Sequence, residues 1–341
     1  MKNDKPKSIE DLMAILRQEK GIAIAGAEQE QALRTMGYYH GYKGYRYIRT
    51  PGNRIAYTRF EELAAIYDFD AQMKALFYPW VMKIETALKN QVLEVLLEAA
   101  NSASFPVAYQ SLMDDYKRLS PKRGAGQSSA ERRRAEERFK SALKHRLDVR
   151  DRIYAAQTKA YQADDPIAAY YLRQDRSLPL WAIFELLSLG EFGHLVSCLN
   201  LHCRAEISRR LGIRQGDDTG AFLPQRLIYA TKDLRNAIAH NDVIFDTRFR
   251  TGRLDRQIVQ AITHASRIRG ITFQTITDYL VLLVYQLKLL RVPGAALAET
   301  ADRFQSLAET LRGQIPIAVF HQILHTDSGT KLSQLKDYIS H

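Results

Sequence analysis

Apolar residues recur every three to four positions along most of this chain, which is the spacing of an amphipathic α-helix. Leu12, Ile15 and Leu16 show the pattern first, behind Ser8, a residue type that caps helix N-termini. The spacing predicts helices over residues 9–20, 28–36, 59–100, 131–160, 163–172, 180–188, 192–199, 204–211, 221–240, 258–266, 275–290, 295–312 and 317–339. No region shows the period-2 alternation of a half-buried strand, so the predicted fold class is all-α.

Several stretches interrupt the helical pattern. Residues 37–47 are rich in Gly and Tyr, which predicts a loop or bent turn whose tyrosines either pack against long helices or stack on RNA bases. Residues 120–129 have the Gly, Pro and Ser of a flexible connection, and a minor hairpin can form at residues 45–57 or 244–253.

The pattern suggests four regions along the chain. They are an N-terminal helical region (1–110), a basic loop–helix insertion (111–162), a helical region (163–253) and a C-terminal helical extension (254–341). The four regions are also compatible with one compact domain.

Composition excludes several classes of protein. The chain has 341 residues, of which 46% are hydrophobic and 10% aromatic, enough for a sizeable core and too many for global disorder. No run of 18 uncharged apolar residues occurs, and the first residues have no signal-peptide core, so we expect no membrane partner. Two cysteines do not make a disulfide scaffold, and a cytoplasmic location is the simplest expectation.

The net charge of +11 is concentrated in one segment. Residues 117–152 contain 13 Lys and Arg against five Asp and Glu, which suggests either a solvated helix laced with ion pairs or an arm that contacts phosphates. The predicted RNA contacts in this segment are Lys122, Arg123, Arg132, Arg133 and Arg134. Lys232 and Arg248 are added because they flank a histidine motif, although Arg248 also fits a solvated hairpin.

Neither a metal nor a cofactor is predicted. Cys198, His202 and Cys203 are three soft ligands, but a structural zinc site needs about four, so buried thiols are the simpler interpretation. The sequence patterns of phosphate-binding loops, serine hydrolases and zinc proteases do not occur.

One polar cluster stands out at the end of a predicted helix. Residues 232–242 read Lys-Asp-Leu-Arg-Asn-Ala-Ile-Ala-His-Asn-Asp and contain Arg235, Asn236 and His240. An Arg–His pair at comparable spacing also occurs at Arg34…His40 and Arg138…His145, about as often as chance predicts. Context favours the third pair, because Asn236 and His240 are four apart on one helix face and small alanines flank the polar residues.

The cluster suits RNA cleavage. A histidine can take the proton of a ribose 2′-hydroxyl or give one to the leaving 5′-oxygen, and a guanidinium can hold the phosphate. No metal is required for this chemistry. The alternative is a plain helix C-terminus, at which His240 and Asn241 cap carbonyls and Arg235 pairs with Asp233 or Asp242.

Four separated motifs resemble those of the Abi-like family of bacterial abortive-infection proteins, of the AbiD/AbiF type. Met36-Gly-Tyr-Tyr-His-Gly-Tyr42 is similar to the family's G-Y-Y element, and residues 67–73 followed by 83–89 are similar to its D-x-x-L-R and I-E-x-x-L-R helix, with Met73 and Lys89 as departures. Residues 178–190 are similar to its P-x-W-x-x-x-E-x-x-S-x-G segment, and residues 234–241 to its L-R-N-x-x-A-H motif.

The resemblance implies a HEPN-like helical bundle with additional helices, and a metal-independent RNase toxin in phage defence. It carries over Arg235 and His240 as catalytic residues and Asn236 as a supporting residue. Because the chain has one such motif, the resemblance implies a homodimer, and it implies toxin–antitoxin-like control that can involve a small RNA. The alternatives are a non-catalytic protein that scaffolds a small RNA and a purely structural interaction protein.

Overall fold

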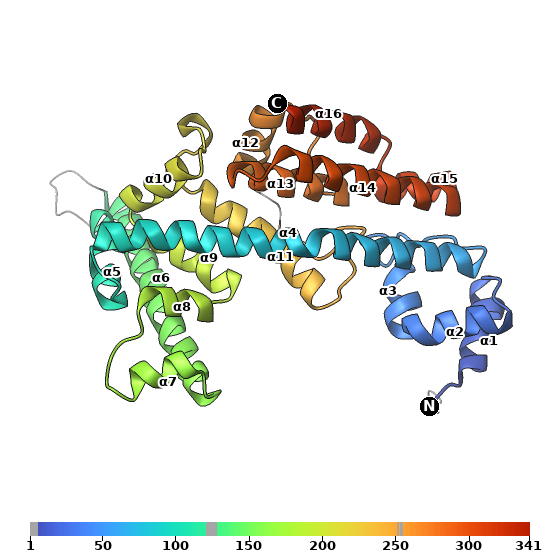
Figure 1. The fold of residues 1–341 in the computed structure, drawn as a ribbon, viewed down its shortest axis with the longest axis horizontal. Coiled ribbons are helices and arrows are strands. Elements are labelled where there is room, and N and C mark those ends of the chain that lie inside the picture. The colour runs from blue at the N-terminus through green and yellow to red at the C-terminus, as the bar shows by residue number, and fades with distance from the viewer. Residues whose placement is uncertain (1–5, 121–127, 251, 253–254) are drawn as a thin grey trace. The chain divides into compact units, whose positions relative to one another are not determined.

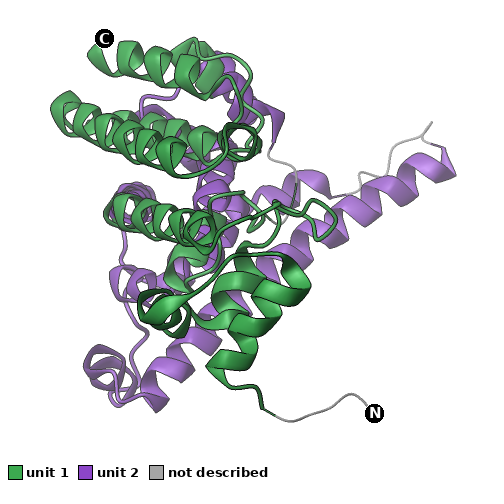
Figure 2. Ribbon diagram, turned by 90° about the vertical axis from the view of Figure 1, so that its right-hand side faces the viewer, with its two compact units in different colours: residues 1–82, 233–254, 262–341 green, residues 83–232, 255–261 purple. Residues whose placement is uncertain are grey.

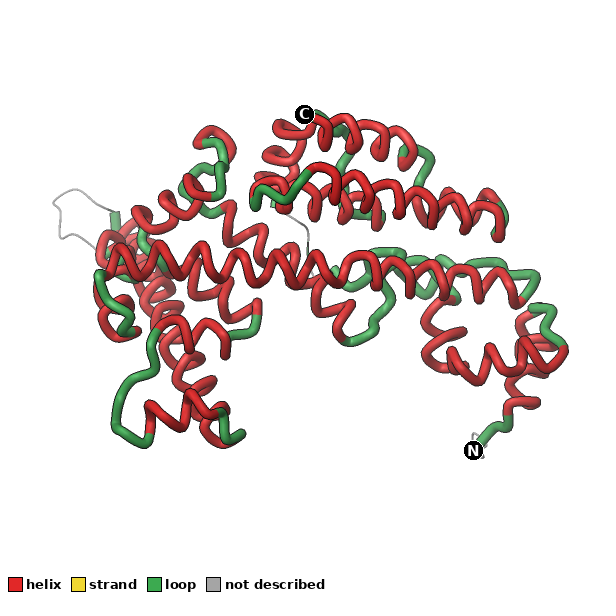
Figure 3. Tube along the Cα trace, in the orientation of Figure 1, coloured by secondary structure: helices red, strands yellow, loops and turns green. Residues whose placement is uncertain are grey.

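The computed structural model describes residues 6–120, 128–250, 252 and 255–341. These residues form helices and connecting turns, and none of them lies in a β-strand (Figure 3). The all-α prediction is therefore confirmed. The hairpin considered at residues 45–57 is reduced to one antiparallel bridge between Tyr47 and Arg54, and residues 244–250 form turns.

The chain divides into two compact units that are discontinuous in sequence (Figure 2). Unit 1 comprises residues 1–82, 233–254 and 262–341, and unit 2 comprises residues 83–232 and 255–261. The long helix α4 (Phe60–Ala100) and the helix α11 (Leu223–Ala239) each contribute one part to each unit. Pro79 lies inside α4 without ending it.

Unit 1 contains the N-terminal and C-terminal helices. They are α1 (Ile9–Lys20), α2 (Gly26–Met36), the π-helix η1 (Gly37–Tyr42), α3 (Lys43–Tyr45), the C-terminal part of α12 (Arg256–Ser266), α13 (Ile276–Leu289), α14 (Gly294–Gln314), α15 (Ile317–Leu324) and α16 (Ser328–Ser340). Helix α13 is buried on all sides over residues 276–287, and it packs against α14 and α16 (Figure 1). A helix that is buried on all sides belongs in a core, so α13 forms the centre of the C-terminal bundle.

Unit 2 is arranged around the basic helix. Its elements are α5 (Phe105–Leu112), η2 (Asp115–Leu119), α6 (Ser129–Gln162), α7 (Pro166–Leu172), α8 (Leu180–Leu186), α9 (Leu189–Cys198), α10 (Leu201–Arg210) and η3 (Gln215–Asp217). Helix α6 packs against α7, α8 and α9. Capping boxes start α6 at Ser128 and α9 at Ser188, as Ser8 does for α1, because each serine is followed three residues later by an acidic side chain.

The prediction of a loop or bent turn at residues 37–47 was wrong, because this stretch is mostly helical. Its first part is the π-helix η1, a wider turn than an α-helix. A Cβ atom added to Gly41 would lie 2.7 Å from Cγ of Met36, so the wide turn depends on the absence of a side chain there. Tyr42 and Tyr45 are buried, as the packing interpretation expects, whereas Tyr39 is 70% exposed.

Candidate functional site

The Arg235…His240 motif lies at the C-terminal end of α11, in unit 1. Arg235 and Asn236 are half-buried, and an Nη1 atom of Arg235 donates to Oδ1 of Asn236 at 3.3 Å. His240 is exposed, and its imidazole has no hydrogen-bond or ion-pair partner among the described residues. The histidine is therefore open to a ligand, whereas its two polar neighbours are bonded to each other.

The backbone after His240 ends the helix in a defined way. Asn241 has a φ of 56°, in the left-handed region, and its N–H donates to the carbonyl of Ile238 at 3.1 Å. The N–H of Asp242 donates to the carbonyl of Ala237 at 2.8 Å. This pair of bonds is the Schellman motif, in which asparagine is the usual substitute for glycine. The backbone thus favours asparagine or glycine at position 241.

A buried ion pair on α4 holds the side chain of Asn241. Nζ of Lys74 donates to Oδ1 of Asn241 at 2.9 Å and lies 2.9 Å from a carboxylate oxygen of Asp70. Lys74 and Asp70 are both buried. Because a buried charge must be paired and hydrogen-bonded, the lysine has a fixed position and so fixes the amide that follows His240.

Asp70 also anchors the segment that leaves the motif. Its carboxylate accepts hydrogen bonds from the N–H groups of Ile244 at 2.8 Å and Phe245 at 2.6 Å, and from the hydroxyl of Tyr45 at 2.7 Å. Burial, and then the nearby negative charge of Asp70, raise the pKa of Tyr45, so its hydroxyl stays protonated as a donor. The D-x-x-M-K part of α4 therefore positions the chain on the C-terminal side of His240.

Arg248 is bound inside the same unit. Its guanidinium pairs with the buried carboxylate of Asp246 at 2.6 Å, donates to the carbonyls of Gly44 at 2.8 Å and Tyr47 at 2.6 Å, and lies 4.1 Å from the ring centre of Tyr47. These contacts tie the segment after the motif to the N-terminal region. A contact between Arg248 and RNA stays a prediction, made by a guanidinium that already has several partners.

His40 is the residue that sequence reasoning missed at this site. Nε2 of His40 lies 3.4 Å from Nδ2 of Asn241, and its ring stands edge-on to Tyr45 and Tyr67. His40 is exposed and belongs to the π-helix η1, a type of turn that is frequent at functional sites. Its only sequence signal was the Arg34…His40 spacing, which chance explains, together with its place in the Gly-Tyr-Tyr element.

The other predicted RNA contacts belong to unit 2. Arg132, Arg133 and Arg134 are exposed in the first turns of α6, and Arg133 lies 3.7 Å from Glu137 in an i,i+4 pair. Lys232 is half-buried on α11, with Nζ 5.5 Å from the ring centre of Tyr229. Lys122 and Arg123 lie outside the described residues.

The two cysteines have the properties of structural thiols. Cys203 is buried and Cys198 half-buried, and burial raises the pKa of both, that of Cys203 to about 11. Within the described ranges, no three His, Cys, Asp or Glu side chains are close enough together to hold a metal ion.

A second pair of family-like motifs meets within unit 2. Nζ of Lys89 lies 3.2 Å from Glu85 on α4 and donates to the carbonyl of Leu187 at 2.8 Å, at the end of α8. A lysine of the helix motif around residues 84–89 therefore forms a hydrogen bond with the tryptophan-containing segment at residues 178–190, as Lys74 does with Asn241.

Comparison with protein families decides the relationship. The model of the Abi-like protein family matches residues 31–246, well over half of the chain. The chain belongs to the Abi-like protein family. This membership indicates a part in abortive-infection defence against phage. The matched span of this Abi-like protein includes η1, the Asp70–Lys74 pair and the Arg235…His240 motif, and leaves out α12 to α16.

Two further comparisons gave no relative. The search of curated proteins found no match, and neither did the search of solved structures. In the part of the chain that the structure describes, no helix combines the length and apolarity needed to cross a membrane.

Proposed function

We propose that this Abi-like protein is a metal-independent endoribonuclease that acts as a toxin in phage defence. The observation that carries the proposal is the contrast at the end of α11. The imidazole of His240 is exposed and unbonded among the described residues, while the backbone and the amide of Asn241 beside it are held by buried groups. A reactive group on a fixed support is what general acid–base catalysis requires.

The proposed reaction is attack by a ribose 2′-hydroxyl on the adjacent phosphorus atom. His240 takes the 2′-proton or delivers a proton to the leaving 5′-oxygen, and the P–O5′ bond breaks as the P–O2′ bond forms. Arg235 stabilises the charge on the phosphate oxygens, and Asn236, which accepts from Arg235 at 3.3 Å, orients the guanidinium. The products are a 2′,3′-cyclic phosphate and a 5′-hydroxyl.

A homodimer completes the proposal. One chain offers one His240, and a second copy supplies a second imidazole, so that one can act as base and the other as acid. His40 gives each chain a further exposed imidazole beside Asn241. The dimer therefore predicts a site with more than one group able to transfer protons.

The test is RNA cleavage by the purified chain in the presence of a metal chelator. We expect cleavage with 2′,3′-cyclic phosphate ends, and loss of cleavage in Arg235→Ala and His240→Ala proteins that stay folded. His202→Ala is the matched control, because His202 is an exposed histidine of unit 2 outside the motif. Wild-type cleavage in both motif variants would contradict the assignment.

A second candidate function is RNA binding without cleavage, as a scaffold for a small RNA. Arg132 and Arg134 favour it, because both side chains are exposed and neither forms an ion pair with a described residue. Such arginines attract phosphates with a steep salt dependence. This function predicts RNA that is bound and remains intact, and it predicts that Arg132 and Arg134 matter more than His240.

A further inference from the structure

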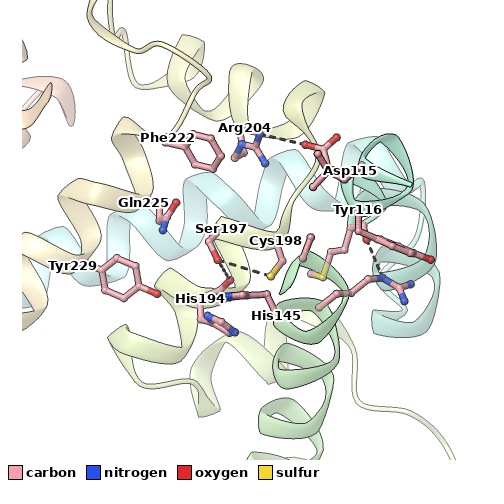
Figure 4. Close-up of a pocket in the computed structure, with 14 residues that line it drawn as sticks. Asp115, Tyr116, His145, His194, Ser197, Cys198, Arg204, Phe222, Gln225 and Tyr229 are labelled. Atoms are coloured by element: carbon pink, nitrogen blue, oxygen red, sulfur yellow. Dashed lines mark hydrogen bonds and ion pairs between the residues drawn. The ribbon is translucent and has the colours of Figure 1, made fainter. Parts of the chain in front are cut away.

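A cavity of about 360 Å³ lies within unit 2, and no residue of the Arg235…His240 motif lines it (Figure 4). Its wall is formed by α6, α9, α10, the start of α11 and the segment that contains η2. The volume is within the range of small-molecule sites. Figure 4 shows His194, Gln225, Phe222 and Tyr116 around the hollow, with Cys198 among them.

Two buried polar atoms of this wall have no hydrogen-bond partner in the described part of the chain: Nε2 of His194 and Nε of Arg204. Arg204 is only 6% exposed, and its other nitrogens bind Asp115 and the carbonyl of Leu199. The free group of Arg204 is therefore one N–H donor. Buried polar groups are nearly always paired, so two orphans in one cavity point to a ligand that pairs with them.

His194 supplies a ring nitrogen that can accept or donate a hydrogen bond. Burial lowers the pKa of His194, and the nearby His145 and Arg152 lower it further. The ring is therefore neutral near pH 7, and it offers Nε2 as an acceptor or a donor according to its tautomer. A ligand edge that carries both a donor and an acceptor satisfies His194 and Arg204 together.

Part of the remaining wall is aromatic and planar. The guanidinium of Arg204 lies 4.1 Å from the ring centre of Phe222, and that of Arg146 lies 5.0 Å from the ring centre of Tyr116. Rings and guanidinium planes stack on flat heteroaromatic groups. The amide of Gln225, which has no hydrogen-bond partner among the described residues, adds a donor and an acceptor for the edge of such a group.

We propose that this cavity binds a nucleobase, either as a mononucleotide or as an unstacked base of an RNA strand. A flat ring with donors and acceptors on its edge matches the planar wall and the two orphan atoms, and a hydrocarbon or a bare phosphate matches only one of the two. The site is independent of the proposed RNA cleavage, because it uses none of Arg235, Asn236 and His240.

The test is to add each of the four ribonucleoside 5′-monophosphates to the full chain. Binding is measured by ligand-observed NMR and by the shift in the melting temperature of the protein. Ribose 5-phosphate, which has no base, is the control ligand. We expect at least one nucleotide to bind and to raise the melting temperature, and ribose 5-phosphate to do neither. A short single-stranded RNA distinguishes the sources, since it binds more tightly than the monophosphates if the site takes a base from a strand.

Two variants test the geometry. His194→Leu removes one orphan atom, and we expect at least a tenfold weaker affinity with no fall in the melting temperature of the free protein. Gln225→Leu should weaken affinity as well, whereas His202→Ala, outside the cavity, should leave it unchanged. The inference is overturned if neither the monophosphates nor the RNA bind, or if affinity is unchanged in both variants. Whether these variants cleave RNA tests only the proposed ribonuclease function and leaves the proposed nucleobase site unaffected.

Discussion

The end of α11 and the first turns of α6 both present nitrogen-bearing side chains to solvent, but their supports differ. At the end of α11, buried bonds from Asp70 and Lys74 hold the residues that follow His240. At the start of α6, the Ser128–Glu131 capping box is followed by an exposed helix whose ion pairs join one turn to the next. Catalysis needs groups that are fixed to within a fraction of an ångström, whereas attraction of phosphates needs only positive charge. The end of α11 therefore suits the proposed cleavage of RNA, and the start of α6 suits the proposed binding of RNA.

The largest expected effect is on the support of α11. Asp70→Ala leaves Lys74 as an unpaired buried charge and leaves the N–H groups of Ile244 and Phe245 without their acceptor. Breaking a buried pair in this way costs about 3–5 kcal/mol of the free energy of unfolding. Urea denaturation measures the loss. Asp68→Ala, at an exposed position of the same helix, should change the free energy of unfolding little. Equal losses in the two variants would contradict a special role of Asp70 in supporting the end of α11.

The second effect concerns the phosphate. Arg235→Ala should slow single-turnover cleavage by about 10²–10³-fold, because it removes a cation that stabilises the transition state. Arg235→Lys, which keeps the charge and loses the forked geometry, should fall between the alanine variant and the wild type. Arg269→Ala, at an exposed position of unit 1, is the control and should cleave normally. If the folded lysine and alanine variants cleaved RNA equally slowly, the claim that Arg235 holds the phosphate by its charge would be contradicted.

The third effect separates the backbone of Asn241 from its side chain. Asn241→Gly keeps the left-handed conformation without strain and loses the contact with Lys74, whereas Asn241→Ala loses the contact and also strains that conformation. The alanine variant should therefore be less stable than the glycine variant by about 1 kcal/mol. Thermal and urea unfolding of the two proteins measure this difference. Equal stabilities would mean that the Schellman motif is not what selects asparagine here.

The smallest effect is at the start of α6. Replacing Arg132 and Arg134 by alanine together should weaken RNA binding and reduce the salt slope by about 1.4, on the scale of 0.7 per phosphate of a single strand. The control removes two exposed arginines of α14, Arg303 and Arg312, and should leave the slope unchanged. Cleavage of RNA that is already bound should continue in both proteins. A slope that does not change would show that α6 is only a solvated helix.

Local signals account for what could be predicted from the sequence. The helical spacing, the serine cap at Ser8 and the helix that carries Arg235 all depend on residues within a few positions of one another. The family-like motif at residues 67–73 also included Asp70, which the structure pairs with Lys74 four residues later. This i,i+4 spacing is visible in the sequence, although the distant residues that the pair contacts are not.

Long-range pairings account for the rest. His40 meets Asn241 across 201 positions, and no local pattern joins a π-turn to a helix end. The wide turn itself depends on Met36 lying against Gly41, which a Gly- and Tyr-rich composition does not reveal. The cavity of unit 2 is likewise assembled from five separate segments, so His194 and Arg204 carry no signal in the sequence alone.

The most direct test of the central claim is the rate of single-turnover RNA cleavage by His240→Ala beside the His202→Ala control, with circular dichroism to establish that both are folded. The account predicts a loss of about 10²–10⁴-fold for His240→Ala, as for removal of a general acid or base, and a normal rate for the control. The wild-type products should end in a 2′,3′-cyclic phosphate. Cleavage by folded His240→Ala at the wild-type rate, with the same product ends, would contradict the claim that this motif cuts RNA.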